Sequence, residues 1–137
     1  MNILIGLLIF LGTFSIMEFM AWFTHKYVMH GFLWSLHKDH HRKDHDSWFE
    51  RNDVFFIFYA VISMSCFYIS SNTTFWYAIP IGFGIMAYGA TYFLVHDIFI
   101  HQRFKIFRNA NNWYAKGVRR AHKMHHKHLG KGQGECF

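Results

Sequence analysis

Apolar residues fall into three long blocks along the chain, and most charged residues lie in the segments between and after them. The blocks cover residues 3–23, 54–70 and 75–95. A helix of about 20 residues, rising about 1.5 Å per residue, spans a hydrocarbon core of about 30 Å. The second block lies at the short end of the spanning range. The pattern therefore predicts an all-α integral membrane protein.

Residues that bend or break helices gather in the third block. Pro80, Gly82, Gly84 and Gly89 lie within it, and apolar residues continue beyond it at 98–100. A span whose backbone turns inside the membrane needs such residues. We therefore expect three to four transmembrane helices, with a tight turn at residues 71–74. The length of 137 residues fits a single domain, residues 1–137.

Positive charge is confined to the two polar segments, 24–53 and 96–137. Five of the 14 Lys and Arg residues lie in the first segment and nine in the second. Three spans place both segments on one side of the membrane, which the positive-inside rule makes the cytoplasmic side of the inner membrane. The net charge of +6 suits anionic lipid or an acidic protein partner equally well. Charge that flanks apolar blocks in this way argues against a nucleic-acid-binding domain.

Ten of the 12 histidines form a pattern that occurs twice. In each half an H-x4-H pair follows a predicted span, and an H-x2-H-H cluster follows the pair. His45 and His128 fall outside the pattern, and we expect them at the surface or beside the site. The ten histidines of the pattern are His25, His30, His37, His40, His41, His96, His101, His122, His125 and His126.

The spacing of these histidines has a structural meaning. A helix turns by about 100° per residue, so an H-x2-H-H cluster is expected to aim three imidazoles at one point. Residues five apart diverge by about 140°, which suits a helix end, and Gly31 follows one pair as a helix stop. Ten histidines give five to each of two metals, with one octahedral position open. Imidazole suits zinc, iron, copper and nickel. We expect a cytoplasmic helical cap that carries this dimetal centre.

Three carboxylates are candidates for orienting these imidazoles. Glu18 lies inside an apolar span, where a carboxylate is costly, and two helical turns before His25. The alternative is a side chain that reaches water at the interface. Asp39 and Asp97 each adjoin predicted ligands and are placed to accept a ring N–H. An ordinary solvated charge or a helix cap accounts for these two aspartates equally well.

The segments around the histidines resemble a known family. They read MEFMAWFTHKYVMHGFLW, LHKDHHR, YGATYFLVHDIFIHQR and AHKMHHKHLGKGQGECF. They are similar to the membrane-bound fatty acid hydroxylase superfamily, and within it to bacterial beta-carotene 3-hydroxylases. The resemblance runs from about Glu18 to the C-terminus. Each of the ten patterned histidines occupies a motif position of that superfamily, which implies that all ten are metal ligands.

The resemblance implies a non-haem di-iron oxygenase that uses O2 as co-substrate. It would hydroxylate C3 of the beta-rings of carotenoids, taking beta-carotene to zeaxanthin through cryptoxanthin. The two electrons would come from a ferredoxin-type donor with its reductase, and zinc can replace iron in a purified sample. The aromatic content of 21% suits either a groove for a polyene or side chains that face membrane lipid.

Other functions share parts of this pattern. A fatty acyl or sterol hydroxylase or desaturase, or a carotenoid ketolase, would use the same metal centre on another substrate. A metal transporter would place its ligands inside the spans along a pathway, whereas these histidines follow the span ends. A structural membrane adaptor has no need of ten patterned histidines.

Overall fold

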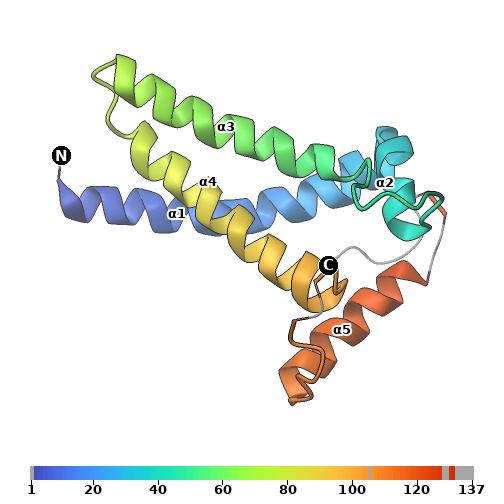
Figure 1. The fold of residues 1–137 in the computed structure, drawn as a ribbon. Helices are drawn as coiled ribbons and strands as arrows, with labels where there is room; N and C mark the ends of the chain where they lie inside the picture. The colour runs from blue at the N-terminus through green and yellow to red at the C-terminus, as the bar shows by residue number, and fades with distance from the viewer. Residues whose placement is uncertain (1, 105, 128–129, 132–137) are drawn as a thin grey trace. The chain divides into compact units, whose positions relative to one another are not determined.

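The structure is a computed structural model that describes residues 2–104, 106–127 and 130–131. The described chain is helical (Figure 1), with α1 at Ile3–Phe23, α2 at Trp34–His41, α3 at Asp53–Asn72, α4 at Ala78–Tyr92 and α5 at Trp113–His126. Two wider helical segments, η1 at Thr24–Phe32 and η2 at Phe93–Ile100, extend α1 and α4. The chain divides into two compact units. The first holds Met1–Ala21 and Asp53–Thr91, and the second holds Trp22–Asn52 and Tyr92–Phe137.

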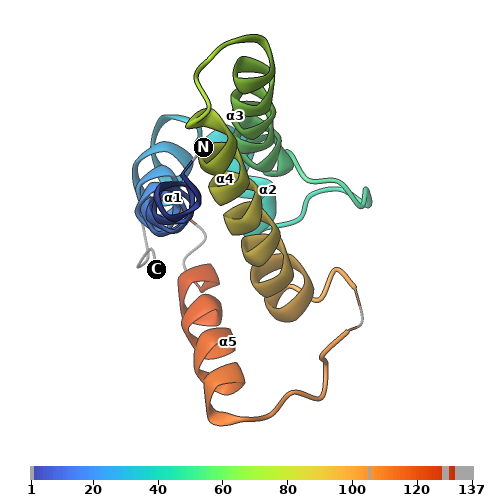
Figure 2. The same ribbon diagram turned by 90° about the vertical axis from the view of Figure 1, so that its left-hand side faces the viewer.

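Three helices are long and apolar enough to cross a membrane, as the sequence predicted. They cover Ile3–Phe32, Asp53–Asn72 and Ala78–Ile100, so each is longer than the apolar block that predicted it. The protein is therefore a multi-pass membrane protein. The predicted turn at 71–74 lies slightly later, between Asn72 and Ala78, where α3 and α4 form a hairpin (Figure 2).

Pro80 and the glycines do not break the third span. Pro80 lies in the first turn of α4, where a missing N–H removes no helical hydrogen bond. Gly82 and Gly84 are buried where α4 meets its neighbours. These residues therefore permit close packing, and the change in helix geometry comes later, in η2.

The first unit buries a small core and turns apolar side chains outward. Met17, Ile85 and Tyr88 are its buried centre, with Phe14 and Tyr59 among the side chains packed around them. Many outward residues are large and apolar, which a helix bundle in lipid tolerates because the surrounding solvent is itself apolar. The exposed apolar side chains of this unit include Leu7, Leu8, Ile57, Phe58, Val61 and Met64.

Gly84 sets how closely α4 can approach α1. A Cβ atom at this position would lie 2.7 Å from Thr13 Cβ and 3.0 Å from the Phe10 carbonyl oxygen. We expect Gly84→Ala to lower the free energy of unfolding by about 1–3 kcal/mol, because the helices must separate to admit the methyl group. Thermal unfolding in detergent measures the change.

Gly12→Ala is the matched control for that substitution. Apart from the adjoining backbone of α1, no atom of the described residues lies within 4 Å of a Cβ atom placed at Gly12, so we expect no loss of stability there. Equal stability of the two alanine variants would contradict close α1–α4 packing at Gly84.

The second unit begins where the two long helices widen. The Leu33 N–H donates to the Val28 carbonyl oxygen at 3.0 Å, and the His101 N–H donates to the His96 carbonyl oxygen at 2.9 Å. Both are bonds between residues five apart, which define π-helical turns. The same unit contains α2 and α5, and the Asn112 side chain caps α5 by accepting from the Ala115 N–H at 2.8 Å. These four elements, with the residue that directly follows η2, carry all ten patterned histidines.

Candidate metal centre

The patterned histidines of the second unit gather into two groups. Within each group, one ring nitrogen from every member lies within 4.8 Å of those of the others. The first group contains five histidines and the second contains four. The first group is His25, His30, His37, His41 and His125, and the second is His40, His101, His122 and His126.

Each H-x2-H-H cluster is split between the two groups, which corrects the expectation that its three imidazoles converge on one point. His37 and His41 of α2 stay in the first group, while His40 joins the histidines of the second half. In α5, His125 lies in the first group, while His122 and His126 of the same cluster lie in the second. The reason is helical geometry. Residue i+4 is rotated by about 40° from residue i, whereas residue i+3 is rotated by about 60° the other way.

The H-x4-H pairs converge because the backbone is widened at each of them. A π-turn bonds residues five apart and so places their side chains on one face. The ring centroids of His25 and His30 are 4.9 Å apart, and those of His96 and His101 are 4.6 Å apart. Gly31 lies at a kink within η1, with φ −96° and ψ −122°. The predicted helix end is therefore a π-turn followed by a kink.

Within the groups, ring nitrogens face one another at separations typical of shared metal ligation. The Nε2 atoms of His30 and His125 are 3.3 Å apart, and those of His37 and His41 are 3.2 Å apart. Two nitrogens about 2.1 Å from one metal, at right angles, lie about 3.0 Å from each other. These nitrogen pairs therefore fit adjacent positions around a single ion.

His96 lies beside the second group. Its ring centroid is 4.9 Å from those of His40 and His122, and Tyr92 stacks on it at 4.8 Å. Its nitrogen is not among those within the common 4.8 Å. With His96 as a fifth member the two groups would be equal in size, and that assignment remains a prediction.

Burial keeps the imidazoles of His37, His41, His122 and His126 uncharged. Burial, with a smaller contribution from neighbouring imidazoles, lowers the pKa of His41 and His122 to about 2 and that of His126 to about 4. Burial also lowers the pKa of His37 to about 3, although a hydrogen bond to Asn52 partly offsets it. At neutral pH these four rings are therefore neutral and present a lone pair, the form in which histidine binds metals.

One buried nitrogen supports the assignment further. His126 Nε2 is inaccessible to solvent and has no hydrogen-bond partner among the described residues. An unpartnered buried nitrogen is costly, and a metal ion would satisfy it. The nitrogen-only donor set suits iron, zinc, copper or nickel rather than magnesium or calcium.

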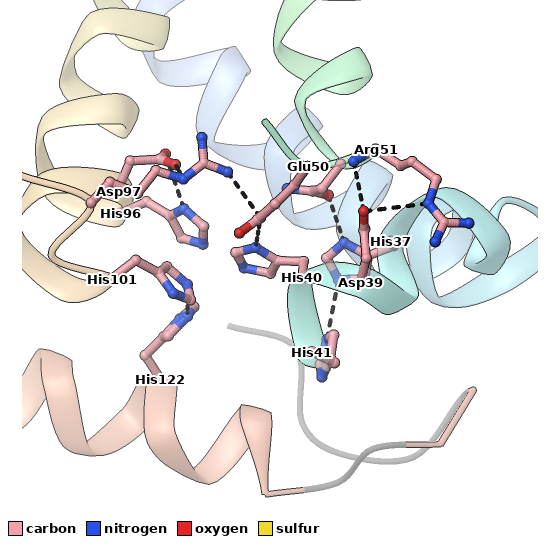
Figure 3. Close-up of polar contacts among 12 residues, drawn as sticks. His37, Asp39, His40, His41, Glu50, Arg51, His96, Asp97, His101 and His122 are labelled. Carbon is pink, nitrogen blue, oxygen red and sulfur yellow. Dashed lines mark hydrogen bonds and ion pairs between the residues drawn. The ribbon is translucent and has the colours of Figure 1, made fainter. Parts of the chain in front are cut away.

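Asp97 and Asp39 have different partners. Asp97 Oδ2 lies 3.2 Å from His96 Nδ1. Asp39 Oδ2 instead accepts from the Arg51 backbone N–H at 2.7 Å and lies 3.3 Å from His45 Nε2, so it orients none of the ten patterned imidazoles (Figure 3). Residue 39 is two positions from His37 and from His41, which puts it on the far side of α2 from both.

The other sequence candidates lie elsewhere. In the first unit, Glu18 accepts a hydrogen bond from the Tyr88 hydroxyl at 2.9 Å, and its predicted action on His25 stays a prediction. His45 is half-buried against Asp39. His128 lies outside the described residues.

Sequence reasoning missed two residues that contact the histidine groups and an arginine that pairs with their carboxylate neighbours. Glu50 Oε2 accepts from His40 Nδ1 at 2.9 Å, and Asn52 Oδ1 accepts from His37 Nδ1 at 2.7 Å (Figure 3). Arg103 forms ion pairs with Glu50 and Asp97. The only sequence signal was position, because Glu50 and Asn52 immediately precede the second span and Arg103 follows HDIFIH.

Comparison with known proteins gives one family and a consistent set of relatives. The sequence model of a family described as fatty acid hydroxylase matches residues 10–136. A beta-carotene hydroxylase of Pantoea ananas is 40% identical over 115 residues, which cover 84% of this chain and 65% of the relative. A beta-carotene hydroxylase of a Paracoccus species, strain N81106, is 34% identical over 95% of this chain and 80% of the relative.

Similarity extends to plants. A chloroplastic beta-carotene 3-hydroxylase 2 of Arabidopsis thaliana is 35% identical over 88% of this chain and 43% of the relative. This chain therefore spans just under two thirds of the Pantoea protein and less than half of the plant protein. No solved structure matches the chain significantly.

Proposed function

Because this chain belongs to the fatty acid hydroxylase family, we propose that it is a membrane monooxygenase that hydroxylates C3 of carotenoid beta-rings. The observation that carries the proposal is the pair of converging histidine groups, in a chain whose bacterial relatives are beta-carotene hydroxylases. The reaction consumes one C–H bond, O2, two electrons and two protons, and it yields one C–OH and one water.

We assign the metals as two iron ions, held by the two histidine groups. Bound iron would supply activation of O2 and oxidation of the C–H bond. The protein's own residues hold neutral imidazoles in place and surround them with buried side chains, which limits access of water to the site. Zinc fits the same donors and would occupy them in a sample prepared without iron.

The second unit supplies a surface for an electron donor. Exposed cations extend over η1, α2 and α5, and they suit an acidic ferredoxin-type protein, which would be reduced by its own reductase. We place this surface on the cytoplasmic side of the inner membrane, in keeping with the positive-inside rule. The exposed cations include Lys26, Lys38, Arg42, Arg120, Lys123 and Lys127.

The proposal is tested in bacteria engineered to accumulate beta-carotene and supplied with a ferredoxin and its reductase. We expect the parent chain to produce cryptoxanthin and zeaxanthin. His41→Ala is expected to reduce product by at least about 100-fold, because it removes a ring from the first group. Chromatography with mass spectrometry of the pigments measures both results.

Ser35→Ala is the matched control, since Ser35 is an exposed, uncharged residue of the same helix and should leave product unchanged. Absence of hydroxylated carotene from membrane-inserted parent protein would refute the carotenoid assignment. A hydroxylated or desaturated acyl chain or sterol in those cells, or a C4 ketone on the ring, would identify another activity of the family.

A further inference from the structure

Three charged side chains, linked by ion pairs, lie beside the second histidine group. Glu50 Oε2 is 2.9 Å from His40 Nδ1 and 2.9 Å from an Arg103 guanidinium nitrogen. Arg103 Nε is 3.1 Å from Asp97 Oδ1, and the other oxygen of Asp97 faces His96 Nδ1. One arginine thus holds two carboxylates, and each carboxylate holds one imidazole.

These ion-paired side chains are well shielded from water. Arg103 is 11% exposed, Asp97 13% and Glu50 14%, while the His40 side chain is only 3% exposed. The Arg103 guanidinium also lies 5.5 Å from the centre of the Trp48 ring. Hydrogen bonds between charged groups are stronger in such surroundings than in water. The arginine keeps two carboxylates close together that would otherwise repel each other.

The first histidine group has a different kind of support. His37 Nδ1 faces the amide oxygen of Asn52, which carries no charge. The carboxylate nearest in sequence, Asp39, is paired with Arg51 and His45 on the far side of α2. The two residues that hold His37 and His40 are only two positions apart in the chain, yet one is a neutral amide and the other an anion.

The chemical consequence follows from the hydrogen bonds. Either acceptor fixes the proton on Nδ1 and leaves Nε2 for the metal. A carboxylate in addition makes Nε2 a stronger electron-pair donor to the metal. Glu50, Asp97 and Arg103 together add one negative charge beside the second group, while Asn52 adds none beside the first. We propose that Glu50, Asp97 and Arg103 are positioning residues that make the two metal positions unequal, the second binding its ion more tightly. This inference rests on the dimetal centre of the proposed function.

The test measures metal binding without substrate. Full-length metal-free protein in detergent is titrated with Fe(II) under anaerobic conditions, in competition with a chromophoric chelator. We expect two binding steps for the parent. Glu50→Gln should weaken the tighter step by about 10–100-fold and leave the weaker step unchanged, because it removes the charge and keeps the shape.

Single-site backgrounds assign the effect to a group. In His125→Ala protein, where the second group remains intact, adding Glu50→Gln should weaken the remaining site. In His101→Ala/His122→Ala protein, where the first group remains, the same change should have no effect. Mössbauer spectra of the iron-57 protein should likewise show one of two doublets altered by Glu50→Gln.

Controls separate positioning from folding. Asp44→Asn changes a carboxylate in the same loop that pairs with Arg51 and should leave both binding steps unchanged. Glu50→Asp should recover part of the affinity lost in Glu50→Gln, and thermal unfolding of the metal-free proteins reports folding separately.

The outcomes distinguish this inference from the proposed function. Equal weakening of both steps by Glu50→Gln, or no weakening of either, would overturn the inequality of the two positions and leave the dimetal centre standing. A parent protein that binds fewer than two ions would overturn the dimetal centre, and with it the proposed oxygenase.

Discussion

Replacing His125 with alanine is expected to remove the metal from the position built by the first half of the sequence. His125 belongs to the second H-x2-H-H cluster, but its ring lies with His25, His30, His37 and His41. The His125 ring centroid is 4.6 Å from that of His25 and 4.7 Å from that of His41. Losing one ligand of five should weaken that position by at least about 10–100-fold and abolish detectable hydroxylation.

His40→Ala is the reciprocal experiment. His40 lies in the first cluster, yet its ring is 4.3 Å from that of His101 and 5.0 Å from that of His126. We expect this variant to lose metal from the second position and keep it at the first. Metal analysis per protein, combined with iron-57 Mössbauer spectra, should show that the two variants lose different doublets.

If each H-x2-H-H cluster instead held a single metal ion, the variants would match the spectra differently. His40→Ala would then give the same spectrum as His37→Ala, because both would empty the position built by α2. Observing that match would contradict the exchange of histidines between the two groups. His45→Ala, outside the repeated pattern, is the control and should retain both ions.

Asp39→Ala is expected to cause a large loss of stability although it removes none of the histidines of the two groups. The Asp39 side chain is fully buried, and its Oδ2 lies 2.7 Å from the Arg51 backbone nitrogen, with His45 and the Arg51 guanidinium also in contact. A hydrogen bond to a charged group contributes about 1.5–3 kcal/mol. We therefore expect a loss of about 2–3 kcal/mol in the metal-free protein, measured by thermal unfolding in detergent.

The same substitution should weaken metal binding at both positions. Asp39 fixes the backbone of Arg51, and the residues on either side of Arg51 hold His37 and His40. Asp44→Ala removes an exposed carboxylate that also pairs with Arg51, and it should change neither stability nor metal binding. An Asp39→Ala protein as stable as the Asp44→Ala protein would show that the buried carboxylate does not anchor the loop.

Much of the fold could be predicted from the sequence because the membrane imposes a local rule. Each span must satisfy its own backbone hydrogen bonds within a continuous apolar stretch, so residues 3–23, 54–70 and 75–95 were sufficient to place three helices. The helix ends were harder to place. Pro80 looked like an interruption, but a proline within the first helical turn costs no hydrogen bond.

The histidine pattern likewise predicted a dimetal centre before any geometry was known. Ten imidazoles in a repeated pattern, each half following a span, indicate metal ligation far more strongly than a surface or interfacial role. Which side chains of a helix lie next to each other depends on the rotation per residue, so the sequence placed residues three or four apart as neighbours. Which ion each ring serves does not depend on that rotation alone.

Tertiary structure decided the rest. The exchange of His40 and His125 depends on α2 and α5 lying beside each other's groups, and Arg103 reaches Glu50 from a distant part of the sequence. At the H-x4-H pairs, π-turns replace hydrogen bonds between residues four apart with bonds between residues five apart, and this change brings the paired histidines onto one face. The sequence alone determined the spans and the ligand types, because these follow from local hydrophobicity and spacing. Only packing between distant segments determined how the ligands are shared and which neighbours support them.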